Sequence, residues 1–170
     1  MSFAEQFFNS IKQVFQTKAH DIIRNQKQKE GQLLDVINIE TCLKLKKGEK
    51  SKQALFGLGS VKPDYQSQEN TEVIIEFKKI GFKQKNNKIR PNEFDIKNGL
   101  AQIIEQALCM NKKEAILVII DGGRAFDKDW DKTENDYTNI FIKNEFVKLS
   151  VIRIAIDPSS GKISYCKMYE

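Results

Sequence analysis

The sequence is poor in the residue types on which several common kinds of active site depend. Its 170 residues contain one histidine, His20, so two-histidine acid–base sites and zinc sites with histidine ligands lack the side chains they need. A Ser-His-Asp site would depend on His20, which lies in a predicted helix without a nucleophile motif nearby. The three cysteines, Cys42, Cys109 and Cys166, have no metal-type spacing and favour reduced, mostly buried thiols.

Two further absences concern membranes and nucleotide cofactors. No apolar run approaches membrane-spanning length, and the first residues lack the basic-then-apolar pattern of a signal peptide. The chain has neither a GxxxxGK[ST] loop nor a Rossmann glycine pattern, which argues against a nucleotide cofactor. We therefore expect a cytoplasmic protein with no membrane partner.

The composition that remains is typical of a soluble globular protein. Hydrophobic residues make up 40% of the chain and charged residues 30%, and the length suits a single domain over residues 1–170. The net charge of +5 is unevenly distributed, because residues 44–52 hold five lysines against one acid. Residues 78–90 hold six basic residues and no acid, whereas residues 127–136 are acidic. Such a balance is compatible with a polyanionic partner.

Hydrophobic periodicity predicts an α/β fold, with a central mixed β-sheet flanked by helices. Apolar residues recur every three or four positions in the first helix, which can extend to about Leu34. The run over residues 114–121 is almost continuously apolar, as in a strand buried on both faces. The pattern predicts helices over residues 3–26, 93–110 and 138–149, and strands over residues 37–46, 54–62, 71–79, 114–121, 151–156 and 162–169.

The most informative stretch is a predicted hairpin over residues 60–79. Side chains alternate along a strand, so Glu76 and Lys78 share one face. Pro63 cannot sit in a central ladder, which places Asp64 at the end of the preceding strand. The polar residues 66–70 form the predicted turn. A hairpin of this kind would bring Asp64 next to Glu76.

Two carboxylates and a lysine at the rim of a sheet have a chemical use. Carboxylate oxygens bind Mg²⁺, for which Mn²⁺ can substitute, and such a cation lowers the pKa of water and stabilises charge on a phosphate. Lys78 would orient the attacking water, help to deprotonate it or stabilise the developing charge. The alternative is an ordinary strand face, with Glu76 and Lys78 solvated or ion-paired and Asp64 as a turn residue after proline.

The segment Pro63-Asp64, followed after a gap by Glu76-Phe77-Lys78, resembles the signature of the PD-(D/E)XK nuclease superfamily, the fold group of type II restriction endonucleases. The resemblance implies that Asp64 and Glu76 bind the metal and that Lys78 is the signature lysine. The predicted elements over roughly residues 3–121 are also similar in order to the helix–strand–strand–strand–helix–strand core of that superfamily. A restriction endonuclease-like fold is therefore expected.

The resemblance also implies accessory residues. An acidic residue on the first helix sometimes joins the metal site in the superfamily, which makes Glu30 a candidate, although its polar neighbours favour a solvated role. A glutamine on the helix after the lysine strand often lies near the active site, and Gln102 or Gln106 would fill that place. Asp121, at the end of a buried strand, is a lesser candidate for a metal ligand.

Basic residues around the hairpin are the candidate DNA contacts, because phosphate contacts need lysine and arginine near the cleavage site. The loop over residues 81–92 is also rich in asparagine and glutamine, which read base edges. It can equally be a surface loop that keeps the protein soluble. The candidates are Lys62, Lys79, Lys83, Lys85, Lys88, Arg90 and Arg124.

The expected function is a Mg²⁺-dependent endonuclease that hydrolyses phosphodiester bonds in DNA, of the restriction or defence type. Cutting both strands then implies a homodimer, since one site cleaves one strand. A repair or junction-resolving nuclease of the same fold is the nearest alternative. Two others stay open: a non-catalytic nucleic-acid-binding protein that keeps the fold, and an unrelated α/β protein whose motif is accidental.

Overall fold

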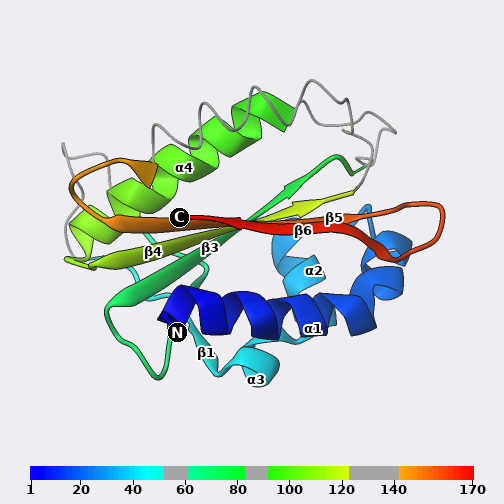
Figure 1. Ribbon diagram of the computed structural model, residues 1–170, viewed down its shortest axis with the longest axis horizontal. Coiled ribbons are helices and arrows are strands. Elements are labelled where there is room, and N and C mark those ends of the chain that lie inside the picture. Colours follow the sequence, from blue (N-terminus) through cyan, green and yellow to red (C-terminus); the bar gives the residue numbers. More distant parts are fainter. Residues whose placement is uncertain (52–60, 83–91, 123–141) are drawn as a thin grey trace.

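The protein folds around a six-stranded mixed sheet with helices on both faces (Figure 1). The computed structural model describes residues 1–51, 61–82, 92–122 and 142–170. The strands lie in the sheet in the order in which they occur in the chain. The β3–β4 and β4–β5 pairs are parallel and the other neighbours antiparallel. The α/β class, with a mixed sheet flanked by helices, is confirmed.

Among the described elements, a helix stands between two strands in the chain order only once, between β3 and β4. The parallel pair β3 and β4 is joined by the long helix α4, as a parallel connection requires a crossover. In chain order the elements are α1 (Phe3–Arg24), α2 (Glu30–Ile37), α3 (Ile39–Leu43), β1 (Leu45–Lys47), β2 (Tyr65–Ser67), β3 (Val73–Ile80), α4 (Asn92–Cys109), β4 (Glu114–Asp121), β5 (Lys148–Ile156) and β6 (Ile163–Tyr169).

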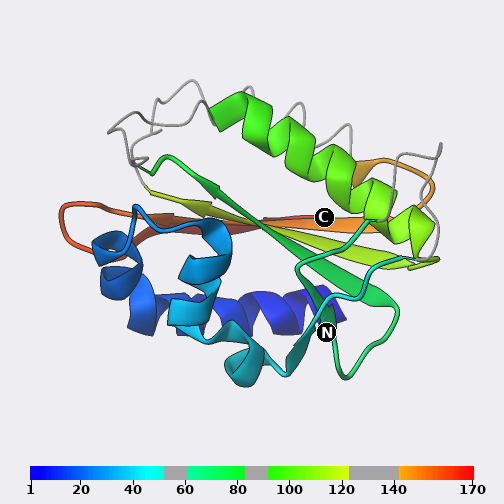
Figure 2. The ribbon, with the colours of Figure 1, turned by 180° about the vertical axis from the view of Figure 1, so that it is seen from behind.

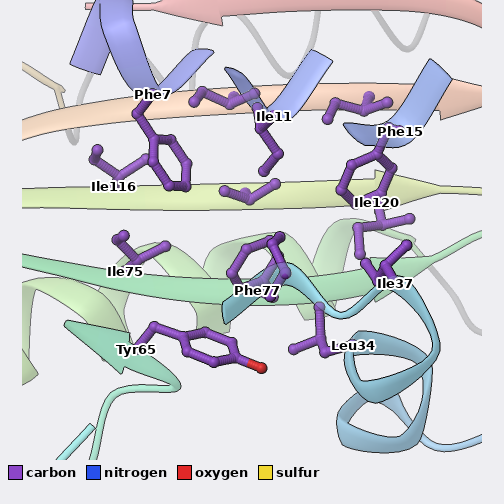
Figure 3. Close-up of a cluster of buried hydrophobic side chains, with 14 of the residues drawn as sticks. Phe7, Ile11, Phe15, Leu34, Ile37, Tyr65, Ile75, Phe77, Ile116 and Ile120 are labelled. Carbon is purple, nitrogen blue, oxygen red and sulfur yellow. The ribbon is translucent and has the colours of Figure 1, made fainter. Parts of the chain in front are cut away.

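The two faces of the sheet carry separate hydrophobic clusters. Helices α1, α2 and α3 cover one face and α4 covers the other (Figures 1 and 2). On the first face, Phe15 of α1 packs in one cluster with Phe77 of β3 and Ile120 of β4 (Figure 3). On the second face, Leu100 and other residues of α4 cluster with Leu117. Phe77 thus points away from α4, and the predicted alternation leaves Glu76 on the α4 face.

The first helix begins where it was predicted to begin, but it ends before the possible extension to Leu34. Ser2 and Glu5 form a capping box, in which each side chain accepts a hydrogen bond from the backbone of the other. The helix ends at Arg24, and a short connection leads to α2 at Glu30. It does not continue to Leu34 as one helix.

The strand predicted over residues 37–46 is wrong, because this segment is mostly helical. Leu33, Leu34 and Ile37 are buried at the spacing of a helix face, and they belong to α2. Asn38 then adopts a left-handed conformation with φ of 50° and separates α2 from α3. Only Leu45 and the two residues after it form a strand. Across the junction of α2 and α3, apolar residues alternate with polar ones. This alternation resembles the two-residue period of a strand and led to the wrong prediction.

The strand predicted over residues 54–62 can be compared with the structure only at its last two positions. Residues 52–60 lie outside the described residues, and positions 61 and 62 are not in a strand. The antiparallel neighbour of β3 is β2, which overlaps the start of the stretch 66–70 predicted as a turn. Asp64 therefore stands immediately before a strand, not at the end of one. The backbone of Pro63 lies so close to Gly48 that a side chain would not fit at position 48. A Cβ there would lie 2.0 Å from the carbonyl oxygen of Pro63.

The C-terminal part differs from its prediction in one element. Of the helix predicted over residues 138–149, positions 138–141 lie outside the described residues, and Lys148 begins β5. Phe146, predicted to face inward, is 75% exposed. The strand β6 at the end of the sheet order is confirmed. The three cysteines are free but not buried as predicted, with Cys42 exposed and the other two half-buried.

Within the described part of the chain, none of the helices combines the length and apolarity that crossing a lipid bilayer demands.

Candidate active site

The hairpin of β2 and β3 brings Asp64 and Glu76 into direct contact, as predicted. The antiparallel register sets Tyr65 opposite Ile75, so the preceding residue, Asp64, lies beside Glu76. The backbone amide of Asp64 donates a 3.1 Å hydrogen bond to Oε2 of Glu76. The backbone amide of Phe77 donates one of 2.8 Å to Oδ2 of Asp64. Both carboxyl groups are thus held by the strand pairing.

The carboxylate of Glu76 is the centre of this arrangement. Its residue is only 3% exposed, yet both oxygens accept hydrogen bonds. Oε1 accepts from the ammonium of Lys78 and from the amide of Gln102, each at 2.8 Å. Oε2 accepts from the Asp64 backbone and, at 3.3 Å, from the amide of Gln106. A buried carboxylate needs such donors, because burying a charge without them is costly.

Both predicted glutamines reach the site from α4. Gln102 and Gln106 stand one helical turn apart, which places them on the same side of the helix. Gln106 is 1% exposed and also donates a 3.1 Å hydrogen bond to the backbone carbonyl of Lys62. It therefore connects α4 both to Glu76 and to the segment that carries Asp64.

Glu30, at the start of α2, approaches the same group of residues. Burial raises the pKa of Glu30 to about 7; the negative charges of Asp64 and Glu76 add to the rise, while Lys78 opposes it. Its Oε1 is buried and has no hydrogen-bond partner among the described residues. The solvated role that the neighbouring polar residues favoured is therefore wrong. Glu30, Asp64 and Glu76 form what we term the acidic cluster.

The acidic cluster occupies an edge of β3 that no described strand covers. β2 pairs with β3 only at Ile74 and Ile75. Beyond this point the backbone amide of Phe77 bonds Asp64, and that of Lys79 bonds the carboxylate of Glu30. Alternate residues of a strand direct their amides to the same edge, so the two carboxylates take the place of a neighbouring strand.

The charges in the cluster are unbalanced. Burial raises the pKa of Asp64 to about 6, helped by the charge of Glu76 and opposed by the hydrogen bond from Phe77. Burial acts to lower the pKa of Lys78, but Glu76 and the other two acids outweigh it, and the net pKa is raised. Lys78 therefore stays an ammonium. With all three acids ionised, the cluster carries two more negative charges than Lys78 neutralises.

The residues present fit a hard divalent cation in their chemistry. Carboxylate oxygens are the preferred ligands of Mg²⁺, which keeps several waters and needs one or two such groups. Oε1 of Glu30, which has no hydrogen-bond partner among the described residues, and the excess negative charge of the acidic cluster both favour a cation here. The side chains are not arranged as a closed cage: among the described residues, no three His, Cys, Asp or Glu groups are placed to hold a metal ion. Glu76 would have to exchange a donor for the cation.

The candidate DNA contacts are placed in different ways. Lys62 is exposed, and its charge acts on Asp64. Lys79 lies half-buried, donates hydrogen bonds to the carbonyl oxygens of Gln26 and Gln28, and stands over the ring of Phe82. Its ammonium thus serves the chain's own structure. Lys83, Lys85, Lys88, Arg90 and Arg124 lie outside the described residues.

Sequence reasoning missed two residues on the α4 face, Arg153 and Gly99. Asp121, the lesser metal candidate, is fully buried and forms a 2.7 Å ion pair with Arg153 of β5, a residue that no sequence motif marked. Gly99 of α4 is the second, since a Cβ there would lie 2.9 Å from Cγ of Lys78. A glycine inside a predicted helix was the available signal, because it costs helix stability unless close packing demands it.

Comparison with known proteins gave no similar family or fold: no family model matches the chain, and no curated protein or solved structure matches it.

Proposed function

We propose that the protein is a Mg²⁺-dependent endonuclease that hydrolyses phosphodiester bonds in DNA, with a restriction endonuclease-like fold. The observation that carries the proposal is the direct contact of Asp64 with Glu76, beside the charged amine of Lys78, at an open strand edge. The three residues meet at one point, although Asp64 precedes β2 and the other two lie on β3. Such convergence is what the motif requires.

The arrangement of elements supports the same proposal. Helix α1 precedes three strands, β1 to β3, that are joined as antiparallel neighbours. Helix α4 then crosses over to β4, which is parallel to β3. Apart from the two additional helices α2 and α3 before β1, this order follows the helix–strand–strand–strand–helix–strand succession that the resemblance implies. The additional strands β5 and β6 extend the sheet on the far side of β4.

Each residue of the cluster has a role in the proposed reaction. Asp64 and Glu76 would hold the cation, with Glu30 as a third carboxylate and Gln102 and Gln106 fixing the orientation of Glu76. When bound, the cation supplies Lewis acidity toward the phosphate and a lower pKa for water. Lys78, released from Glu76, would orient the attacking water and stabilise negative charge on the phosphate oxygens. The substrate would lie along the open edge of β3.

The test compares nicking of supercoiled plasmid DNA by the wild type with Mg²⁺, with Mn²⁺ and with EDTA. We expect cleavage in both metals, none in EDTA, and a loss of roughly 100-fold or more in Lys78→Ala, since the variant removes transition-state stabilisation. Lys12→Ala, which changes an exposed lysine on α1, is the matched control and should cut like the wild type. Equal cutting by Lys78→Ala and the control would refute the assignment.

The restriction or defence type and the homodimer belong to this proposal. Two sites related by symmetry would cut both strands of a duplex. A repair or junction-resolving nuclease would instead prefer branched substrates. Rates on a linear duplex and on a four-way junction of the same sequence separate the two, and sedimentation in the presence of the duplex reports whether the active species is a dimer.

A second candidate is a non-catalytic nucleic-acid-binding protein that keeps the fold. It is favoured by one observation: both oxygens of Glu76 are already occupied by protein donors, including Lys78 at 2.8 Å. A buried carboxylate whose two oxygens are satisfied by its own chain can serve stability alone. This candidate predicts DNA binding with a steep salt dependence and no cleavage in any metal.

A further inference from the structure

A hollow lined by residues with polar side chains opens in the connection between α1 and α2. Its volume is about 380 Å³, and Arg24, Asn25, Gln26, Lys27, Gln28 and Gln32 line it. Small-molecule sites occupy roughly 300–1,000 Å³, so the hollow is large enough for an organic group and too large for a single ion.

The lining has a consistent chemistry. It presents two cations, Arg24 and Lys27, and four carboxamide side chains, but no carboxylate. One of the amide oxygens, Oε1 of Gln28, is buried and has no hydrogen-bond partner among the described residues. A ligand that combines negative charge with a hydrogen-bond donor would match the two cations and the carboxamide groups of the lining. A nucleotide has this combination: its phosphate is the anion, and a base amino group is the donor.

The hollow is fixed to the strand that carries Lys78. The ammonium of Lys79 binds the carbonyl oxygens of Gln26 and Gln28, which ties the lining segment to β3. Glu30, a member of the acidic cluster, follows this segment directly. Both ribbon views show the connection at the end of the sheet where β3 and β4 finish (Figures 1 and 2). Ligands of open α/β sheets gather at that end.

We propose that this hollow binds one unstacked nucleotide of a DNA strand whose neighbouring phosphodiester lies at the acidic cluster. The cations Arg24 and Lys27 contact the phosphate, and the carboxamides contact the edge of the base, as glutamine and asparagine do with adenine. The inference rests on the proposed function for the position of the reacting bond, but the binding itself needs no cleavage. Because a paired base cannot enter a hollow, the substrate has an unpaired nucleotide near the cut.

Binding in EDTA tests the hollow without cleavage. Fluorescence anisotropy with a labelled single-stranded 12-mer gives the Kd of the wild type, of Arg24→Ala/Lys27→Ala and of Gln28→Ala. We expect the double variant to bind at least tenfold more weakly, with a reduced salt dependence, because each phosphate that is no longer neutralised lowers the salt slope by about one. Gln28→Ala, which keeps the charge, should bind about threefold to tenfold more weakly. A blunt duplex of the same sequence should show a smaller decrease in affinity.

The matched control is Lys12→Ala/Lys143→Ala, which removes two exposed lysines outside the hollow. Thermal melting establishes whether each variant is folded. If Arg24→Ala/Lys27→Ala is not folded, Gln28→Ala still tests the hollow. Equal decreases in the hollow and control variants would show that only net charge matters and would overturn the inference. So would failure of the wild type to bind the 12-mer, or full competition by inorganic phosphate at low millimolar concentration.

The outcomes separate this inference from the proposed function. If the wild type cuts no DNA but the hollow variants bind it more weakly, the nuclease proposal fails and the nucleotide site stands. If the wild type cuts DNA and the hollow variants bind and cut equally well, the nucleotide site fails alone. Lys78→Ala should lose cleavage, and in that background binding of the 12-mer should still weaken when Arg24 and Lys27 are replaced, since Lys78 does not line the hollow.

Discussion

Gly99 of α4 lies directly against the side chain of Lys78. A Cβ at position 99 would stand 3.4 Å from Cε and only 2.9 Å from Cγ of this lysine, and the second distance is shorter than real Cβ contacts. Glycine in a helix interior costs about 1 kcal/mol relative to alanine. The absence of a side chain here is what lets α4 press Lys78 toward Glu76, where the two form a 2.8 Å ion pair.

Gly99→Ala should therefore improve the helix and harm the site. We expect a melting temperature close to that of the wild type, because the gain in helix propensity offsets the local displacement. Cleavage should fall roughly 10- to 100-fold, since a misplacement of about 1 Å at a reacting group has effects of that size. Asn98→Ala, at an exposed position of the same helix, is the control for kcat/KM and melting. Unchanged activity in Gly99→Ala would contradict the role given to Lys78.

The raised pKa values predict that stability falls as the pH rises. The pKa of Glu30 changes from an ordinary value of 4.5 to about 7 in the folded chain, so the folded state binds its proton more tightly than the unfolded state. The stabilisation is complete below about pH 4.5 and is lost as the pH passes 7. The full effect is on the order of 3 kcal/mol, with Asp64 acting in the same direction as its pKa of about 6 is passed.

Urea denaturation between about pH 4.5 and about pH 8 measures this dependence. Glu30→Gln should flatten the profile across that range, because it removes the titrating group while keeping its shape. Mg²⁺ should restore stability mainly above about pH 7, where the carboxylates are ionised and can bind it. A wild-type profile that rises over the same range, or one that Glu30→Gln leaves unaltered, would show that burial does not control this carboxyl group.

Gln106 should matter more for stability than Gln102, although both bond Glu76. Gln106 is 1% exposed and donates to two acceptors, Oε2 of Glu76 and the carbonyl oxygen of Lys62. Gln106→Leu leaves the Lys62 carbonyl without this donor, which costs about 1–3 kcal/mol. Gln102→Leu, at a half-buried position, should cost less. Urea titrations of the two variants measure the difference, and a larger loss in Gln102→Leu would reverse the assignment.

The buried ion pair of Asp121 and Arg153 should behave differently under single and double substitution. Asp121→Ala leaves a buried arginine without its 2.7 Å partner and should cost about 3–5 kcal/mol. Combining it with Arg153→Met removes the isolated charge and should recover part of that loss. The free energies of unfolding of the four proteins form a double-mutant cycle. Additive losses would mean that the two side chains do not depend on one another.

Sequence patterns captured the features that depend on local periodicity. The almost continuously apolar run from Glu114 to Asp121 is a buried strand, as predicted. In β3, Glu76 and Phe77 lie on opposite faces of the sheet because side chains alternate along a strand. The contact of Asp64 with Glu76 followed from a hairpin, and it is present even though the strand before it was misplaced. The connection between Asp64 and Glu76 is short, so the two residues stay close together even when the exact register of the hairpin is predicted wrongly.

Features that depend on packing were beyond the sequence. Nothing local shows that Glu30 folds back to the acidic cluster, because this depends on the break between α1 and α2 and on the tertiary fold. The alternation that imitated a strand near Asn38 failed because one residue in a left-handed conformation reset the helix face. The pairing of Asp121 with Arg153 joins strands separated by a long connection, so no short-range pattern could reveal it.

Where β3 extends past β2, its amides at Phe77 and Lys79 are held by carboxylates, not by a neighbouring backbone. Deuterium would therefore enter at these two positions whenever a carboxylate swings away, even while the sheet stays closed. The amides of Glu76 and Lys78 face β4 and would exchange only on larger opening. Hydrogen exchange at these two pairs of amides therefore reports two different motions. One pair reports movement of the carboxylates, and the other reports opening of the sheet.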